Sequence, residues 1–135
     1  MIFGIGIDLI KVSRIKKILD KHGSIFLKKV FTDQEIKKNN QFISRENKFA
    51  KSFASKEAFV KALGTGFRNN ITFKDIELMN SNTGKPYLYL SKSVKKELKK
   101  KTPIGYEPII NISISDEIDY VISNVIISFK KNNRL

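Results

Sequence analysis

Three charged side chains, Asp8, Glu57 and Lys61, stand in settings where they could carry out chemistry. Asp8 interrupts an apolar run near the start of the chain, and a carboxylate there needs a cation or hydrogen-bond donors to remain ionised. Glu57 and Lys61 stand four residues apart, in the order that favours an ion pair along a helix. The pair is flanked by three small residues: Ala50, Ala54 and Ala58. Because a solvent-facing helix surface usually carries longer polar side chains, this stripe is a candidate site for acid–base chemistry.

Each of these residues also has a structural interpretation, which the local sequence leaves open. Asp8 can accept the backbone amides of a turn, and an exposed Glu57–Lys61 pair would contribute only about 0.3–0.5 kcal/mol to stability. The turn Gly64-Thr65-Gly66 can present bare amides to a phosphate, but it can equally end a helix. Gly84-Lys85-Pro86 fits a hairpin loop.

The composition narrows the possible partners and reactions. Twenty-six Lys and Arg against thirteen Asp and Glu give a net charge of +13, which predicts an anionic partner. Nucleic acid, a phosphorylated cofactor, an acidic protein and an anionic membrane all meet that description. With no Cys and a single histidine, disulfides, thiolate zinc sites, cysteine nucleophiles and multi-histidine metal sites are excluded. The lone His22 fits a surface position better than a general base.

No stretch of the sequence has the pattern of a targeting or membrane segment. The opening apolar run lacks a basic leader and a cleavage site, and it stops at Asp8. No apolar stretch approaches the ~18–20 residues that span a bilayer. Hydrophobic residues make up 41% of the chain, which is enough for a folded core. We therefore expect a single domain, residues 1–135, in the cytoplasm.

The first half of the chain predicts a strand and three helices. β-Branched residues and two glycines over residues 2–10 indicate a buried strand whose bare backbone admits a close neighbour. An amphipathic helix is expected after Ser13. Thr32-Asp33-Gln34-Glu35 has the spacing of a capping box, so a second helix should begin at Asp33. A longer helix is expected over residues 44–63, ended by the glycine turn.

The second half adds a hairpin, a Lys-rich helix, two further strands and a frayed tail. The hairpin is expected over residues 71–79 and 87–90, and the helix over residues 93–101. The two further strands are expected over residues 110–115 and 120–129, and the tail over residues 130–135. The fold class is α+β, with strands from both ends of the chain in a largely antiparallel sheet around the long helix. Within that helix, Lys56 falls in the arc of bulky apolar residues and has no partner nearby in the sequence.

Taken together and in this order, the motifs resemble those of the 4′-phosphopantetheinyl transferases, and within that family the short holo-[acyl-carrier-protein] synthases. The matching stretches span nearly the whole chain: Gly4-Ile5-Gly6-Ile7-Asp8, Arg14-Ile15, Phe31-Thr32-x-x-Glu35, Phe53-Ala54-x-Lys56-Glu57-Ala58-Phe59-x-Lys61-Ala62-x-Gly64-Thr65-Gly66, Asp75-Ile76-Glu77, Gly84-Lys85-Pro86 and Ser113-Ile114-Ser115. The Gly-Ile-Asp opening, combined with Lys-Glu-Ala-x-x-Lys-Ala roughly fifty residues later, is the specific part of the match.

The resemblance implies transfer of the phosphopantetheine arm of coenzyme A to a serine of apo acyl carrier protein, in fatty acid biosynthesis. Adenosine 3′,5′-bisphosphate would leave, and Mg²⁺ would be the metal. By position in the family motifs, Asp8 and Glu57 would hold the ion beside the diphosphate of coenzyme A, and oxygen ligands suit Mg²⁺. Glu57 would also take the proton of the carrier serine, and Lys61 would pair with the phosphates. The coenzyme cleft would be lined by Gly64, Thr65, Gly66, Lys85 and Pro86.

The resemblance further implies a homotrimer with its active sites between subunits, and an acidic acyl carrier protein as partner. The basic residues Arg14, Lys17 and Lys21 would then steer and dock that partner. This interpretation includes no nucleic-acid and no membrane partner. Two positions depart from the family pattern: Ser52 stands where Arg is usual, and Asp116 where His is usual. Both usual residues are associated with the nucleotide end of coenzyme A.

Two other functions remain open from the sequence. A small basic RNA- or DNA-binding domain would account for the charge of +13, but not for Asp8 or Glu57. An inactive scaffold of the same fold, which still binds carrier protein, would account for Ser52 and Asp116. Transfer of phosphopantetheine to carrier protein and salt-dependent binding of RNA are the measurements that separate the three.

Overall fold

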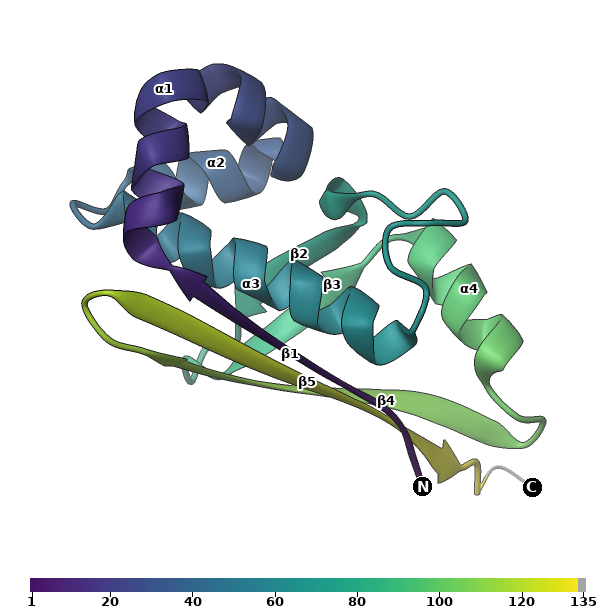
Figure 1. Ribbon diagram of the computed structural model, residues 1–135. Coiled ribbons are helices and arrows are strands. Elements are labelled where there is room, and N and C mark those ends of the chain that lie inside the picture. The colour runs from purple at the N-terminus through teal and green to yellow at the C-terminus, as the bar shows by residue number, and fades with distance from the viewer. Residues whose placement is uncertain (134–135) are drawn as a thin grey trace.

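Helix α3 (Arg45–Leu63) runs through the middle of the fold, and the other elements pack around it (Figure 1). The structure is a computed structural model that describes residues 1–133. A three-stranded sheet lies along one side of α3, helices α1 (Val12–Val30) and α2 (Asp33–Asn40) cover its N-terminal half, and α4 (Lys92–Lys101) lies near its other end. The prediction of a central long helix is confirmed, with the helix beginning one residue after Ser44.

Two antiparallel sheets contain the strands of residues 1–133. In the larger sheet, β5 (Tyr120–Lys131) lies between β1 (Ile2–Lys11) and β4 (Tyr106–Asp116). The expected hairpin forms a separate sheet of β2 (Ile76–Asn80) and β3 (Pro86–Leu90). The α+β fold class is therefore confirmed, and strands from the two ends of the chain do pair. The prediction of a frayed tail over residues 130–135 was wrong at its start, because Lys130 and Lys131 belong to β5. Residues 134 and 135 lie outside the described residues.

The strand expected over residues 71–79 begins later than predicted. Residues Phe73–Asp75 form a short 3-10 turn, and extended structure starts at Ile76. The Asp75 carboxylate accepts hydrogen bonds from the Thr72 amide at 2.7 Å and from the Thr72 hydroxyl at 3.0 Å, which closes the turn. A side chain that satisfies backbone donors in this way competes with strand pairing.

The capping box at the start of α2 is present as predicted. The Glu35 amide donates to Thr32 Oγ1 at 3.2 Å, and the Thr32 amide donates to Glu35 Oε1 at 3.2 Å. Glu35 is nevertheless almost completely buried, which an ordinary capping residue is not. Its carboxylate has a further partner within the core.

That partner is Lys56, whose place in the apolar arc of α3 had no local explanation. Its side chain has no exposed surface, and its Nζ donates to Glu35 Oε1 at 2.6 Å. The same ammonium donates to the main-chain oxygen of Phe73 at 2.8 Å and to that of Ile76. One buried cation therefore ties α2, α3 and the entry to β2 together, immediately before Glu57 in the chain.

Strand β1 meets α3 through bare backbone, as the two glycines predicted. A Cβ atom added to Gly4 would lie 1.9 Å from the Ala62 oxygen, and one added to Gly6 would lie 1.8 Å from the Ala58 oxygen. This close contact holds Asp8, two residues further along β1, against the helix. The expectation of a buried strand holds for one face only, because α3 covers the face with the glycines and the side chains of the other face are exposed.

We expect Gly6→Ala to lower the free energy of unfolding by about 1–3 kcal/mol, because the added methyl group would push β1 away from the backbone of α3. Urea unfolding followed by circular dichroism measures the change. Gly23→Ala is the matched control, since nothing lies within 4 Å of a Cβ added there, in helix α1. Alanine at that position should be neutral or slightly stabilising. Equal stability of the two variants would contradict the close contact.

Candidate active site

Asp8 and Lys61 form an ion pair between β1 and α3. Lys61 Nζ donates to Asp8 Oδ1 at 3.1 Å and to the main-chain oxygen of Ile7 at 2.9 Å. The Asp8 side chain is 16% exposed and that of Lys61 is 51% exposed. The expected alternative, a solvated ion pair between Glu57 and Lys61, is not among the ion pairs of the described chain. Asp8 also reaches a cation, as its apolar setting required, rather than a set of turn amides.

Glu57 lies half-buried on the same side of α3, one turn before Lys61. Its pKa is raised above the ordinary value of 4.5, first because burial disfavours the charged form and then because Asp8 is negatively charged; Lys61 partly offsets this. Asp8 is therefore near enough to act on the Glu57 carboxylate. The structure brings together the three charged residues that the sequence singled out.

This donor set fits a hard divalent cation. Two carboxylates that repel each other in a partly buried place gain most from a positive ion between them. Within residues 1–133 there is no cluster of three or more histidine, cysteine or acidic side chains. A metal at Asp8 and Glu57 would thus need ligands from water and substrate as well, which is the usual way that proteins hold Mg²⁺.

The glycine turn follows this site at the end of α3. Gly64 adopts a left-handed conformation with φ of 83°, and its amide donates to the main-chain oxygens of Val60 and Lys61. Its role as a helix stop is confirmed. Thr65 Oγ1 donates to the oxygen of Gly66 at 2.9 Å, so the hydroxyl group is engaged locally.

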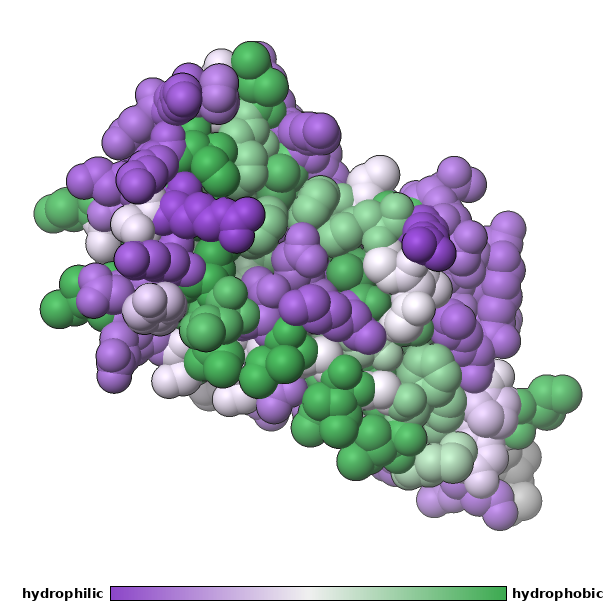
Figure 2. Space-filling model, in the orientation of Figure 1, coloured by the Kyte–Doolittle hydropathy of each residue, from purple (hydrophilic) through white to green (hydrophobic). Residues whose placement is uncertain are grey.

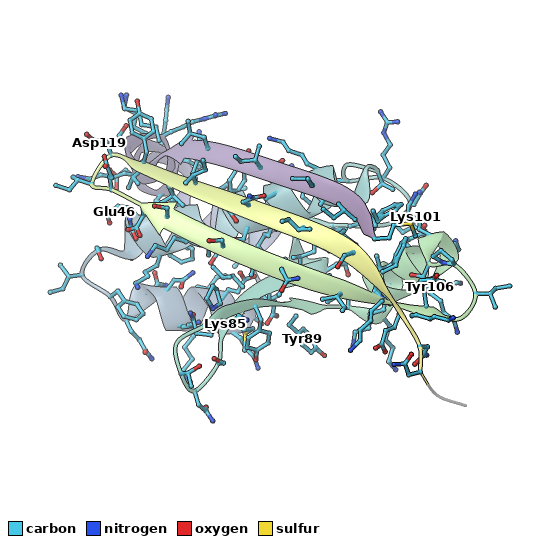
Figure 3. All side chains as sticks on the ribbon, turned by 90° about the horizontal axis from the view of Figure 1, so that it is seen from below. Glu46, Lys85, Tyr89, Lys101, Tyr106 and Asp119 are labelled. Atoms are coloured by element: carbon cyan, nitrogen blue, oxygen red, sulfur yellow. The ribbon has the colours of Figure 1, made fainter. Side chains whose placement is uncertain are left out.

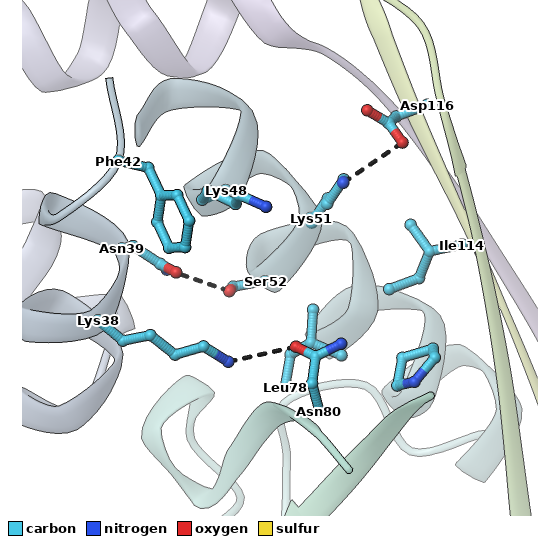
Figure 4. A pocket seen from close by; sticks show the side chains of 11 residues that line it. Lys38, Asn39, Phe42, Lys48, Lys51, Ser52, Leu78, Asn80, Ile114 and Asp116 are labelled. Carbon is cyan, nitrogen blue, oxygen red and sulfur yellow. Dashed lines mark hydrogen bonds and ion pairs between the residues drawn. The ribbon is translucent and has the colours of Figure 1, made fainter. Parts of the chain in front are cut away.

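A pocket of about 250 Å³ lies on another side of α3, between α2, β2 and β4 (Figure 4). Three lysines and one acid contribute its charge, Lys38, Lys48, Lys51 and Asp116, and the rest of the lining is Asn39, Phe42, Ser52, Leu78, Asn80, Pro86 and Ile114. The excess of positive charge and the apolar walls suit a small phosphorylated ligand.

Asp116 does not stand in this pocket as an unpaired acid. Its Oδ1 lies 3.3 Å from Lys51 Nζ, and its Oδ2 accepts a hydrogen bond from Asn47 Nδ2 at 3.2 Å. Ser52 is buried, and its hydroxyl oxygen accepts from Asn39 Nδ2 at 3.3 Å. Figure 4 shows the pair of Lys51 with Asp116 and the hydrogen bond between Asn39 and Ser52. Lys51 therefore offsets the charge of Asp116.

Helix α3 separates the pocket from the carboxylates. Asp8 of β1 pairs with Ser123 of β5, which in turn pairs with Ile114 of β4, so the three lie in one row across the sheet. The helix crosses this row at Ser55, whose hydroxyl lies 3.2 Å from that of Ser123. Asp8 and the pocket residue Ile114 are thus about 10 Å apart, with α3 above the strand between them.

The other predicted site residues are spread over the surface. Arg14, Lys17 and Lys21 are all exposed on α1, which begins directly after β1. Lys85 lies in the turn between β2 and β3, outside the lysine pocket, while Pro86 lines that pocket. The glycine turn does not line the pocket that Pro86 lines.

A family model for the 4′-phosphopantetheinyl transferase superfamily matches residues 4–107. The chain belongs to this superfamily. A holo-[acyl-carrier-protein] synthase of Ehrlichia ruminantium (strain Welgevonden) is 45% identical over 130 residues, which cover 94% of the chain and 97% of that relative.

Solved structures of other holo-[acyl-carrier-protein] synthases share the fold. That of Neisseria meningitidis superposes with a TM-score of 0.85 at 34% identity, over 95% of this chain and 99% of the other. That of Bacillus anthracis str. Ames, in complex with CoA (3′,5′-ADP), superposes with a TM-score of 0.75 at 33% identity, over 94% of this chain and 96% of the other. The resemblance and the fold inferred from the motifs are confirmed, and the chain is an enzyme, a phosphopantetheinyl transferase.

The sequence did not predict the lysine pocket of this transferase as a site, although the unusual residues Ser52 and Asp116 suggested Lys51 or another lysine as compensation. Lys38 comes from α2, Lys48 and Lys51 from α3, and no local pattern distinguishes them from other surface lysines. The one available indication was the pair of unusual residues, Ser52 and Asp116, because both line the same pocket. In the described part of this transferase, none of the helices is long and apolar enough to cross a membrane.

Proposed function

We propose that this transferase, as a single domain of residues 1–135 in the cytoplasm, moves the 4′-phosphopantetheine group of coenzyme A to a serine of apo acyl carrier protein. The reaction would require Mg²⁺, release adenosine 3′,5′-bisphosphate and serve fatty acid biosynthesis. The observation that carries the proposal is the convergence of Asp8, Glu57 and Lys61 at the contact between β1 and α3. The names of the relatives and the ligand of the Bacillus anthracis structure support the choice of substrates.

Each of the three charged residues has a role in this transfer. Glu57 takes the proton of the serine hydroxyl as the serine oxygen bonds to the phosphorus that carries pantetheine, and the bond from that phosphorus to the leaving bisphosphate breaks. Asp8 and Glu57 would hold Mg²⁺, which when bound neutralises charge on the diphosphate. Lys61, whose ammonium is half-exposed, pairs with a phosphate oxygen and stabilises the leaving group.

The lysine pocket is proposed to take the nucleotide end of coenzyme A. Lys38, Lys48 and Lys51 supply the positive charge that the usual Arg and His would otherwise supply, and the pairing of Lys51 with Asp116 removes the repulsion expected from an acid beside a phosphate. We propose that the glycine turn 64–66 and the hairpin residues Lys85 and Pro86 line the rest of the coenzyme cleft.

A homotrimer is proposed because the β1 side of the outer face of the larger sheet carries apolar side chains that are exposed. Ile5, Ile7 and Leu9 of β1 are 59%, 52% and 62% exposed. Figure 3 shows this sheet face with no element over it, and Figure 2 shows hydrophobic side chains gathered along the same edge of the molecule. Copies of the chain that join the β1 edge of one to the β4 edge of the next would bury this face in a closed ring. Each set of carboxylates would then face a neighbour's lysine pocket.

The proposed activity is tested with purified protein, coenzyme A, Mg²⁺ and apo acyl carrier protein. We expect mass spectrometry to find the mass of one phosphopantetheine group added to the carrier. A chain that binds carrier protein but adds no mass with any divalent metal would be an inactive scaffold. Tight, steeply salt-dependent binding of mixed-sequence RNA, without transfer, would favour the nucleic-acid-binding alternative.

The basic face of α1, formed by Arg14, Lys17 and Lys21, is proposed to bind the acidic carrier protein. We expect Arg14→Glu to raise the KM for carrier protein roughly tenfold, because a charge that attracts the partner becomes one that repels it. The KM for coenzyme A should stay nearly constant. Lys96→Glu, the same charge change on exposed α4, is the matched control. Equal losses for both substrates would argue against docking on α1.

A further inference from the structure

Lys61 forms an ion pair with the Asp8 carboxylate, and a metal ion bound to the same carboxylate would have to disturb this pair. Its Nζ donates to Asp8 Oδ1 at 3.1 Å and to the main-chain oxygen of Ile7 at 2.9 Å. The Asp8 side chain is only 16% exposed, and Lys61 is its ion-pair partner within residues 1–133. Lys61 thus stands where a second cation would be expected to bind.

An ammonium and a divalent cation against one carboxylate repel each other. Metal binding at Asp8 therefore requires the Lys61 ammonium to withdraw. The side chain can do so, because it is 51% exposed and its four-carbon stem rotates freely. What the ammonium then needs is another anionic partner, and a phosphate group of coenzyme A is one.

We propose that Lys61 is an internal counter-ion for Asp8 that makes the metal and coenzyme A bind as a coupled pair. Without coenzyme A, Lys61 competes with the metal for Asp8. With coenzyme A, the ammonium turns to a phosphate and leaves Asp8 to the metal. The inference rests on the proposed function, since that function makes Asp8 a metal ligand and the diphosphate a partner of Lys61. By linkage, the metal raises the affinity for coenzyme A by the same factor.

The main-chain oxygen of Ile7 keeps this exchange local. Ile7 lies in β1, where it pairs with Asn124 of β5, so its carbonyl group is held by the sheet. The hydrogen bond from Lys61 to this oxygen does not depend on the charge of Asp8. In the proposed exchange, the ammonium keeps this hydrogen bond to Ile7 and turns from the carboxylate toward a phosphate.

Binding of Mn²⁺ to the whole protein tests the inference without turnover, because no carrier protein is present. Electron paramagnetic resonance follows free Mn²⁺ for the wild type and for Lys61→Met, each with and without coenzyme A. Without coenzyme A, Lys61→Met should bind Mn²⁺ roughly two- to tenfold more tightly than the wild type. The variant lacks the ion pair with Asp8 that competes with the metal, and a partly exposed ion pair changes an affinity by about that factor. With saturating coenzyme A, this advantage should disappear.

Two controls locate the effect. Lys96→Met removes the same charge from exposed α4 and should leave the Mn²⁺ affinity unchanged. Asp8→Asn should weaken Mn²⁺ binding in both the wild-type and the Lys61→Met background. If Lys61→Met binds Mn²⁺ no better than a wild type that does bind it, the counter-ion role is overturned while the proposed function stands. If no variant binds Mn²⁺, even with coenzyme A, the proposed metal site fails and the counter-ion role with it.

Discussion

Replacing Glu57 with Gln is expected to lower kcat by about 10²–10⁴-fold, the range typical for loss of a general base. The amide keeps the size of the side chain but can neither take a proton nor give a metal a charged oxygen. A coupled mass-spectrometric assay of carrier modification measures the rate. Glu107→Gln, at an exposed position of β4, should keep the wild-type rate. If Glu57→Gln retains more than a tenth of the wild-type kcat, proton transfer does not depend on this residue.

The pH dependence follows from the surroundings of Glu57. Burial and the charge of Asp8 raise the pKa of Glu57 above 4.5, and only the ionised form can accept the serine proton. In the metal-free protein, the Glu57 carboxyl group should therefore become protonated, as the pH is lowered, at a higher pH than an ordinary glutamate would, and an NMR titration without divalent cations measures this pKa; added Mg²⁺ should lower it. Because a raised folded-state pKa means that ionised Glu57 opposes folding above that pKa, Glu57→Gln should unfold at a temperature no lower than the wild type at neutral pH.

Lys56→Ala is expected to cost about 3–5 kcal/mol of the free energy of unfolding, because it leaves the buried Glu35 carboxylate without its cation. Burial raises the pKa of Glu35 and lowers that of Lys56, and the pair opposes both shifts. Urea unfolding measures the loss. Lys100→Ala, which breaks an exposed pair with Glu97, is the matched control and should change stability by less than about 1 kcal/mol.

The double variant Glu35→Leu/Lys56→Met distinguishes a stranded charge from a lost contact. It removes both members of the pair and leaves side chains of similar volume, so it should recover most of the stability. If the double variant is as unstable as Lys56→Ala, the two residues stabilise the fold independently, through the Thr32 cap and the main-chain oxygens of Phe73 and Ile76.

Local patterns predicted the parts of the fold that local interactions stabilise. The capping box at Thr32 and the helix stop at Gly64 are each satisfied within four residues, and both lie where the sequence placed them. The partners of Lys56 could not be predicted in the same way, because they come from segments seventeen to twenty-one residues away. Its setting in an apolar arc showed only that a partner had to exist.

The sequence likewise predicted one part of the candidate site and not the other. Asp8, Glu57 and Lys61 stood out because their charge conflicted with apolar or small neighbours, and the structure brings them together, although the sequence suggested a pair of Glu57 with Lys61. The lysine pocket gave no such conflict. The exposure of the outer face of β1 could not be predicted either. A strand of continuous apolar residues has the same sequence pattern whether a helix or another copy of the chain covers it.

The position of α3 between the carboxylates and the lysine pocket has a genetic consequence. In the proposed ring, one chain with a defective carboxylate and another with defective pocket lysines would each be inactive alone. When the two variants are co-expressed, every mixed trimer contains one interface at which the intact carboxylates of one variant face the intact lysine pocket of the other. Such interallelic complementation would restore part of the activity, whereas two defects on the same side of α3 would restore none.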